Sequence, residues 1–160
     1  MALTTGDRIP ELELHVPGAD GMPSPVDTAE LLGKGRVVLF GLPGAFTPGC
    51  SQVHLPGFIE KADALTAKGI DTVVCTSVND AFVMGAWAEA QQAGDIVMLA
   101  DGNGTFAAAM GLEMDGTGFG LGTRSKRYAA VIEEGVITRL DIDEDGGVAA
   151  SSCEAVLEHL

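Results

Sequence analysis

The chain has 160 residues, of which 46% are hydrophobic and 20% charged, and its formal net charge at neutral pH is −14. A chain of this length predicts one compact domain spanning residues 1–160, and its apolar content excludes intrinsic disorder. The strong negative charge argues against nucleic acid and anionic membrane surfaces as partners. The longest apolar runs are also far shorter than the roughly 20 residues that a membrane span requires.

The start of the chain and its cysteines bear on the compartment. The start has neither the basic nor the apolar segment of a secretory signal, so we expect a cytoplasmic protein. Cys50, Cys75 and Cys153 are too few and too scattered for a disulfide framework, and no Cys-x-x-Cys pair indicates zinc. Each cysteine therefore has to be judged from its own surroundings.

The first half of the chain predicts strands that alternate with helices. Residues 36–42 are a β-branched apolar run between turn signals, which indicates a buried strand. After Cys50 the apolar residues keep a helical spacing as far as Gly69, and Pro56 predicts a kink within that helix. The next expected elements are a strand at 70–78, a helix that begins after Asn79-Asp80 and ends at Gly94, a strand at 95–100 and a short helix at 105–110.

The second half of the chain has a different pattern. Glycines between positions 116 and 122 favour a loop, and strands at 127–133 and 136–142 are predicted to form an antiparallel hairpin. The last ten residues are expected to form a closing helix with Leu157 and Leu160 facing inward. A parallel βαβ unit followed by a hairpin and a helix indicates a thioredoxin-like α/β fold, a mixed central sheet flanked by helices, with an N-terminal extension through Leu32.

The segment from Pro43 to Cys50 lies between a predicted strand and the first turn of a helix. The first N–H groups of a helix lack partners and its dipole is positive there, so this position stabilises the thiolate form of Cys50. Thr47 brings a hydroxyl within reach of the sulfur or of a bound oxygen substrate. Pro43 and Pro48 stiffen the turn and shield the sulfur from water.

Topology is expected to bring Arg127 to the same place. The parallel strands at 36–42 and 70–78 end at one edge of the sheet, and an antiparallel strand that begins at Arg127 begins at that edge. Its guanidinium favours the thiolate and donates several hydrogen bonds to a polar ligand. Such a site suits attack on a peroxide O–O bond, because the donors stabilise the alkoxide or hydroxide that leaves.

Several segments resemble the peroxiredoxins, in particular the type 5 and plant type II group. The segment 41–58 contains Pro43-x-x-x-Thr47-x-x-Cys50, which is similar to the peroxidatic signature of that family. Segments 78–87, 99–102 and 124–128 follow in the family's order, so the resemblance covers nearly the whole chain. It implies thiol-dependent reduction of hydrogen peroxide and alkyl hydroperoxides without a metal or an organic cofactor.

The resemblance also implies roles for individual residues. Cys50 corresponds to the peroxidatic cysteine, which oxidation converts to a sulfenic acid. Thr47 and Arg127 correspond to its activating partners and Pro43 to its shield. The residues expected to line the substrate pocket and its apolar entrance are Phe46, Gly49, Leu112 and Phe119. The family further implies a homodimer through the active-site edge, where the expected exposed residues are Phe46, Phe82 and Gly85.

The sequence leaves open which thiol resolves the sulfenic acid. Cys75 matches the spacing of the resolving cysteine in plant type II members, and Cys153 lies near the place used by animal type 5 members. A disulfide needs Cα atoms within about 7 Å, so either pairing requires the first turn of the Cys50 helix to unwind. Direct attack by glutathione, a glutaredoxin or a thioredoxin-fold protein is the third route.

Two other functions would also use a reactive Cys50. A dithiol oxidoreductase shares the fold, but it needs a second cysteine three residues on, where the chain has Val53. A non-catalytic redox sensor or chaperone-like interaction module differs from a peroxidase only in its rate of reaction with peroxide.

Two motifs have both a structural and a functional interpretation. His54, one turn after Cys50, either tunes the thiolate or is structural, and the structural role is the more common one for such a histidine. The segment Asp141-x-Asp143-x-Asp145-Gly146 resembles the opening of a calcium loop. Its twelfth position is Ser152, where a calcium loop needs glutamate, so calcium is not favoured.

Overall fold

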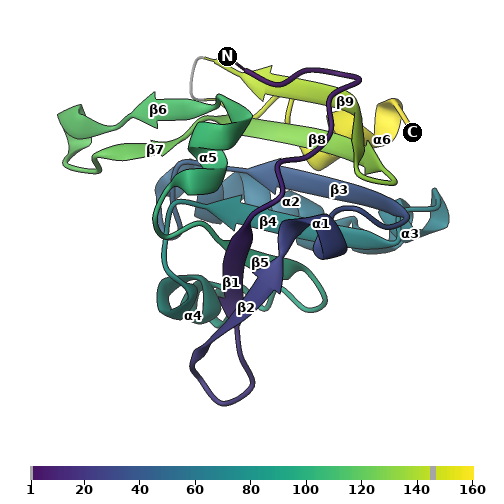
Figure 1. Cartoon of the computed structure of the whole chain (residues 1–160). Coiled ribbons are helices and arrows are strands. Elements are labelled where there is room, and N and C mark those ends of the chain that lie inside the picture. The colour runs from purple at the N-terminus through teal and green to yellow at the C-terminus, as the bar shows by residue number, and fades with distance from the viewer. Residues whose placement is uncertain (1, 145–146) are drawn as a thin grey trace.

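A mixed sheet of seven strands organises the chain (Figure 1). The computed structural model describes residues 2–144 and 147–160, so Met1 and the Asp145-Gly146 part of the calcium-like motif lie outside the described residues. The strands follow the order β2-β1-β5-β4-β3-β8-β9 across the sheet. Their bounds are Glu13–Pro17 (β1), Pro23–Asp27 (β2), Arg36–Gly41 (β3), Thr72–Ser77 (β4), Val97–Ala100 (β5), Arg127–Glu133 (β8) and Val136–Asp143 (β9).

The pairing of the strands confirms the predicted thioredoxin-like arrangement. Strands β3, β4 and β5 run parallel to one another, whereas β8 is antiparallel to β3 and β9 is antiparallel to β8. The segment expected to be an N-terminal extension instead supplies β1 and β2, which continue the same sheet beyond β5. This segment is therefore part of the central sheet.

Helices cover both faces of the sheet, and the side chains of β3 show how the core divides. Val38 and Phe40 belong to one buried cluster, together with Phe58 and Trp87, whereas Val37 and Leu39 belong to a second cluster. This alternation is the period of two that a strand buried on both faces produces. The helical elements are α1 (Thr28–Leu31), η1 (Cys50–His54), α2 (Leu55–Glu60), α3 (Ala62–Ala67), α4 (Ala81–Gln91), α5 (Thr105–Met110) and α6 (Cys153–Glu158).

No helix among the described residues has the length and apolar character needed to cross a bilayer. Leu157 within the closing helix α6 and Leu160 just after it pack against the first cluster, as the sequence predicts. The helix after β4 begins at the predicted cap, where the Asp80 side chain accepts a hydrogen bond from the Val83 N–H. It ends at Gln92, which adopts a left-handed conformation, two residues before the predicted end at Gly94.

The helix after Cys50 differs from the prediction of one kinked helix. It opens with a single π-helical turn, η1, in which the Leu55 N–H reaches back five residues to the Cys50 carbonyl. Pro56 lies in the first turn of α2, directly after η1. The interruption falls at Lys61, between α2 and α3, and not at the predicted position of Pro56.

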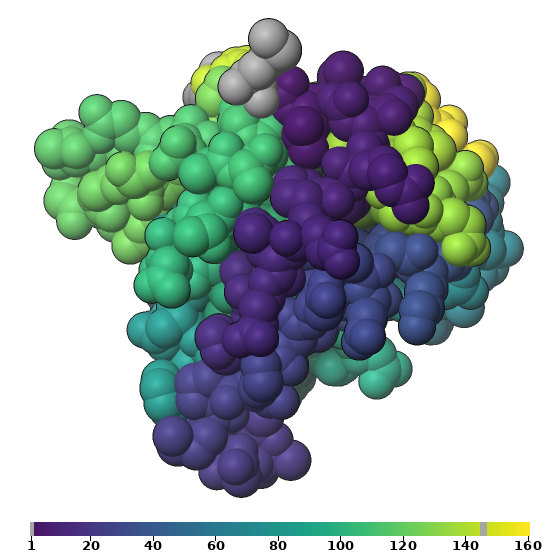
Figure 2. Space-filling view, in the orientation of Figure 1, coloured from purple at the N-terminus to yellow at the C-terminus, as the bar shows by residue number. Residues whose placement is uncertain are grey.

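The glycine-rich segment forms the tip of a second, smaller sheet. Strands β6 (Glu113–Asp115) and β7 (Thr123–Ser125) pair antiparallel, and a short 3-10 turn, η2 (Thr117–Phe119), connects them. This hairpin projects from the body of the molecule in Figures 1 and 2. The sequence predicts the loop at 116–122 but not the two strands, because three residues are too few to establish an alternating pattern.

Candidate active site

Cys50 occupies the first position of η1, directly after the turn that follows β3. Its side chain is fully buried. The turn is held by Thr47, whose Oγ1 donates to the Gly44 carbonyl at 2.7 Å and whose own carbonyl accepts from the Ser51 N–H at 2.9 Å. Phe46 within this turn has a φ of 66°, a left-handed conformation that is unusual for a residue with a side chain. The sulfur is thus fixed at the start of a helical segment by a tight, unusual turn.

Arg127 lies against the Cys50 sulfur. It is the first residue of β8, and the antiparallel pairing of Gly41 with Tyr128 brings it to the end of β3 from which the chain leads to Cys50. The Arg127 Nη2 donates to the Cys50 Sγ at 3.4 Å, and the arginine is only 5% exposed. The expected convergence of these two residues, 77 positions apart, is present in the fold.

Gly49 leaves the space that the guanidinium occupies. A Cβ atom at this position would lie 3.0 Å from the Arg127 Nη2, closer than ordinary contact distance. The backbone of Gly49 is right-handed helical, so its conformation is one that other residues adopt readily. The glycine is therefore explained by the close approach of the arginine and not by its φ angle.

His54 completes a buried chain of hydrogen bonds behind the sulfur. Its Nδ1 lies 3.0 Å from the Arg127 Nη1, and its Nε2 lies 2.9 Å from the Ser151 carbonyl oxygen. A guanidinium can only donate, so Nδ1 is the acceptor and Nε2 carries the proton that is donated to Ser151. Burial, followed by the nearby Arg127 charge, lowers the pKa of His54 to about 4, so the ring is neutral at pH 7. The sequence favours a purely structural role for His54, whereas the structure places its ring in direct contact with Arg127.

Asp143 holds the loop that presents the Ser151 carbonyl. Its carboxylate accepts hydrogen bonds from the N–H groups of Ala149, Ala150 and Ser151 and from the Ser151 hydroxyl. Burial alone raises the pKa of Asp143, but these hydrogen bonds outweigh burial and hold it below its ordinary value. In the sequence, Asp143 is noticeable only as part of the calcium-like motif. That motif indicates a metal ligand, whereas the structure shows an acceptor for backbone N–H groups.

Arg124 links the projecting hairpin to the Cys50 turn. Its Nε donates to the Leu121 carbonyl at 3.1 Å and its Nη1 donates to the Pro43 carbonyl at 3.1 Å. Pro43 is half-buried at the beginning of the turn. Gly44 leaves room for this side chain, because a Cβ there would clash with the Arg124 guanidinium. The sequence includes Arg124 in a segment that resembles peroxiredoxins but gives no indication of this contact.

The residues expected to line the pocket entrance separate into two groups. Phe46 and Phe119 are 57% and 89% exposed, so both offer apolar surface to solvent or to a partner. Leu112 is fully buried in the second core cluster, on the face of the sheet away from Cys50. The expected place of Leu112 at the pocket entrance stays a prediction, because a buried side chain can still form an inner wall of a pocket.

Comparisons with known proteins show which family the chain belongs to. The Redoxin family model matches residues 4–157. Peroxiredoxin-2E-2, chloroplastic, of Oryza sativa subsp. japonica is 48% identical over 99% of this chain and 72% of its own length. Peroxiredoxin-2D of Arabidopsis thaliana is 40% identical over 99% of this chain and 98% of its own length.

A solved structure gives the same result. Reduced Prx3 in complex with hydrogen peroxide from Vibrio vulnificus superposes with a TM-score of 0.93 at 46% identity, covering 98% of both chains. The chain belongs to the peroxiredoxin family. This peroxiredoxin is accordingly a thiol-dependent peroxidase, an oxidoreductase with a thioredoxin-like fold.

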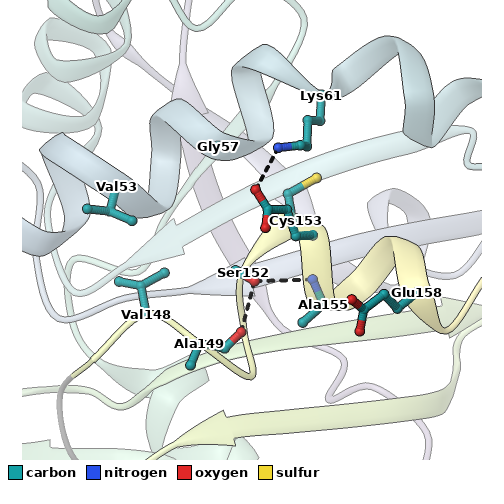
Figure 3. A pocket seen from close by; sticks show the side chains of 10 residues that line it. Val53, Gly57, Lys61, Val148, Ala149, Ser152, Cys153, Ala155 and Glu158 are labelled. Carbon is teal, nitrogen blue, oxygen red and sulfur yellow. Dashed lines mark hydrogen bonds and ion pairs between the residues drawn. The ribbon is translucent and has the colours of Figure 1, made fainter.

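The other two cysteines of this peroxiredoxin are buried thiols. Cys75 lies in the middle of β4, and burial, followed by the neighbouring Cys50, raises its pKa well above the ordinary value. Cys153 opens α6, and burial raises its pKa to about 11. Cys153 borders a cavity of about 420 Å³ between α2 and α6, and its sulfur points toward the helix that carries Lys61 (Figure 3). All three cysteines are free.

The described residues contain no group of three or more His, Cys, Asp or Glu side chains placed to hold a metal ion. The group that contacts the Cys50 sulfur is the Arg127 guanidinium, a hydrogen-bond donor that His54 supports from behind. Such a group can stabilise a thiolate and an oxygen anion that forms beside it. These properties fit a reaction in which a thiolate sulfur attacks an oxygen atom and an oxygen anion leaves.

Proposed function

We propose that this peroxiredoxin reduces hydrogen peroxide and alkyl hydroperoxides by direct attack of the Cys50 thiolate on the O–O bond. The sulfur takes the terminal hydroxyl group and becomes a sulfenic acid, the O–O bond breaks, and the hydroxide or alkoxide that leaves is protonated to water or an alcohol. The contact of the Arg127 Nη2 with the Cys50 Sγ at 3.4 Å is the main support for this proposal. The Vibrio vulnificus relative, whose structure contains hydrogen peroxide, supports the same substrate.

Thr47 and Pro43 have complementary roles in this proposal. The Thr47 O–H is directed to the Gly44 carbonyl, so its oxygen offers lone pairs that accept the hydrogen bond of a hydroperoxide O–H. Arg127 donates to the oxygen that gains negative charge. Pro43 carries no N–H and stiffens the turn beside the sulfur, which limits the approach of water. Phe46, Gly49 and Phe119 contribute the pocket walls and its apolar surroundings.

We further propose that an external small thiol, such as glutathione acting directly or through a glutaredoxin, resolves the sulfenic acid. The thiol attacks the Cys50 sulfur and releases water, and a second thiol then reduces the mixed disulfide to the free cysteine and an oxidised disulfide. The raised pKa of Cys153, about 11, and of buried Cys75 leaves almost no thiolate on either residue at pH 7. Both are therefore weak internal nucleophiles.

Stopped-flow oxidation tests the peroxidase proposal, and Trp87 provides the signal. It is the single tryptophan of the chain, and its Nε1 donates to the Ser51 Oγ at 2.9 Å, next to Cys50. We expect Arg127→Lys to slow the reaction with hydrogen peroxide by about 100-fold, the usual effect of losing one donor to a developing oxyanion. The matched control Arg139→Lys alters a surface ion pair with Asp141 and should leave the rate unchanged. A slow reaction that does not depend on Arg127 would favour a redox sensor over an enzyme.

Mass mapping tests the proposed reductant. After one equivalent each of peroxide and glutathione, followed by acid quenching, we expect glutathione on Cys50 and no bridge to Cys75 or Cys153. The double variant Cys75→Ser, Cys153→Ser should turn over with glutathione as fast as the wild type. An intramolecular disulfide that forms faster than the glutathione adduct would assign resolution to one of the two buried cysteines.

We also propose that the protein is a homodimer through the surface around the active-site edge. Phe46 and Phe82 are 57% and 56% exposed, and a dimer through this surface would remove both apolar side chains from water. Sedimentation equilibrium should give twice the mass of 16.4 kDa for the wild type. Phe82→Glu should shift the protein toward the monomer, whereas a wild-type monomer at all concentrations would contradict the proposal.

A further inference from the structure

The carboxylate of Asp143 organises a segment distant from it in sequence. Its Oδ2 accepts from the Ala149 N–H at 3.1 Å, the Ser151 N–H at 2.9 Å and the Ser151 Oγ at 2.5 Å, and its Oδ1 accepts from the Ala150 N–H at 3.0 Å. Four donors therefore converge on one half-buried side chain at the end of β9. Hydrogen bonds to a charged acceptor are about twice as strong as neutral ones, so this carboxylate fixes the backbone of residues 149–151.

The fixed segment delivers one carbonyl oxygen to the active site. Ser151 is fully buried, and its carbonyl accepts from the His54 Nε2 at 2.9 Å. The same residue thus donates two hydrogen bonds to Asp143 through its N–H and hydroxyl and presents its carbonyl to the ring. The position of that carbonyl follows from the position of the Asp143 carboxylate.

The Ser151 carbonyl and the Arg127 guanidinium together determine which nitrogen of His54 carries the proton. A neutral imidazole has one N–H, and the Ser151 carbonyl can only accept, so the proton resides on Nε2 and the Nδ1 lone pair faces Arg127. If the proton moved to Nδ1, that N–H would face the guanidinium N–H and the 3.0 Å contact would be lost. Arg127 would then lack the acceptor that orients its fork toward Cys50.

We propose that Asp143 is a positioning residue for the peroxidatic thiolate, acting through the Ser151 carbonyl, the His54 tautomer and the Arg127 guanidinium. The inference rests on the proposed role of Cys50 for its effect on rate, but its structural part concerns His54 and Arg127 alone. The register of the sheet supports it, because Asp143 is the cross-strand partner of Arg127. The carboxylate and the guanidinium are therefore held on adjacent strands. Ser151 of the loop and His54 connect them through hydrogen bonds.

The carboxylate is required because all of its neighbours donate. In Asp143→Asn one side-chain oxygen becomes an NH₂ group, which would face donors from Ala149 and Ser151 or from Ala150. The matched control is Asp141→Asn, which removes the same charge two residues earlier on β9. Asp141 pairs with the Arg139 side chain and is outside the path to Cys50. Comparing the two variants separates the local hydrogen bonds from the general loss of one negative charge.

The test measures the tautomer and the rate in the full-length protein. Nitrogen-15 spectra distinguish a protonated ring nitrogen from an unprotonated one, and His54 is one of three histidines to assign. We expect the Nε2–H tautomer in the wild type and in Asp141→Asn, and a mixture of tautomers in Asp143→Asn. The second-order rate constant with hydrogen peroxide should fall by about tenfold in Asp143→Asn only.

The outcomes distinguish this inference from the proposed function. An unchanged His54 tautomer in Asp143→Asn would overturn the positioning role, whatever the rate. A changed tautomer in Asp143→Asn, with a slow and Arg127-independent reaction of the wild type, would retain the positioning role and remove the peroxidase role of Cys50. If Asp143→Asn does not fold, Ser151→Ala keeps the carbonyl but removes the 2.5 Å hydroxyl contact. It should then give a smaller change of the same tautomer ratio, and the absence of any change would overturn the inference.

Discussion

Arg127 and His54 depend on each other for their protonation states. The guanidinium is always charged, and its contact at 3.0 Å with the His54 Nδ1 is compatible only with a neutral ring. The ring is enclosed by Phe40 and Phe58, whose centroids lie 5.1 and 5.6 Å from its own. An added proton would place two cations side by side in an apolar environment. The lowered pKa of His54, about 4, expresses this cost.

The acid stability of the protein should therefore depend on His54. In the unfolded chain this histidine takes up a proton near its ordinary pKa of 6.5, whereas in the folded chain it resists protonation until about pH 4. In that interval the unfolded state binds more protons, so the free energy of unfolding should fall as the pH decreases, by up to about 3 kcal/mol. Urea unfolding at pH 7 and pH 5 would measure the slope. His54→Gln removes the titrating group, and an equal slope in this variant would contradict the assignment.

Gly49 allows a prediction about geometry rather than charge. Gly49→Ala adds a Cβ at 3.0 Å from the Arg127 Nη2, which should displace the guanidinium from the sulfur and slow the reaction with peroxide by about tenfold. The matched control is Gly57→Ala, because a Cβ at Gly57, inside α2, meets nothing within 4 Å. We expect the control to keep its rate and to gain about 0.5–1 kcal/mol in stability from its higher helix propensity. Equal rates in both variants would show that Arg127 tolerates the added methyl group.

At the scale of elements, the Cys50 turn is held from two sides. On one side the Ala45 N–H donates to the Asn79 Oδ1 at 2.9 Å, which ties the turn to the segment between β4 and α4. On the other side Arg124 of β7 donates to the Pro43 carbonyl. The turn therefore receives support from a loop of the main sheet and from the small hairpin, although neither belongs to the sequence motif that contains Cys50.

The hairpin contact can be tested by hydrogen exchange. Arg124→Ala removes both of the arginine's 3.1 Å bonds, to Leu121 and Pro43, so we expect faster amide exchange in residues 113–125 and in the turn. The global free energy of unfolding should fall by about 1 kcal/mol, the usual contribution of such bonds. Lys126→Ala is the control, since the Lys126 side chain forms a surface ion pair with Glu144. Unchanged exchange in the turn would mean that the Asn79 contact and the bonds of Thr47 within the turn hold it without Arg124.

The elements that the sequence predicts are those specified by local pattern. The apolar strands β3 and β4, the cap at Asp80 and the helix α5 follow from residues within a few positions of one another. The meeting of Arg127 with Cys50 is also predictable, because it follows from strand direction alone. The link from Asp143 through Ser151 to His54 is not, because it depends on the path of a loop that no periodicity specifies.

At the scale of the whole molecule, the sheet separates the reactive sulfur from half of the core. The clusters on its two faces share no residue, and Cys50, Cys75 and Cys153 all belong to the same one. The opposite face is filled by side chains such as Leu39 and Phe106, packed beneath α5 and the N-terminal strands. Changes on that face can alter stability without contacting the sulfur. Substitutions there provide a background for separating effects on folding from effects on catalysis.

The overall charge of −14 adds an effect that no single residue carries. At low ionic strength the protein's field should repel an anionic hydroperoxide, such as that of a fatty acid, and slow its encounter with Cys50. Salt screens this repulsion over a Debye length of about 10 Å at 0.1 M, so the rate with the anionic substrate should rise several-fold between about 10 mM and 300 mM salt. The neutral tert-butyl hydroperoxide provides the control, because its encounter is not steered by net charge. Stopped-flow rates for both substrates across the salt series measure this effect. If the two rates depended on salt in the same way, the positive Arg124 and Arg127 beside the turn, and not the net charge, would control the field that the substrate meets.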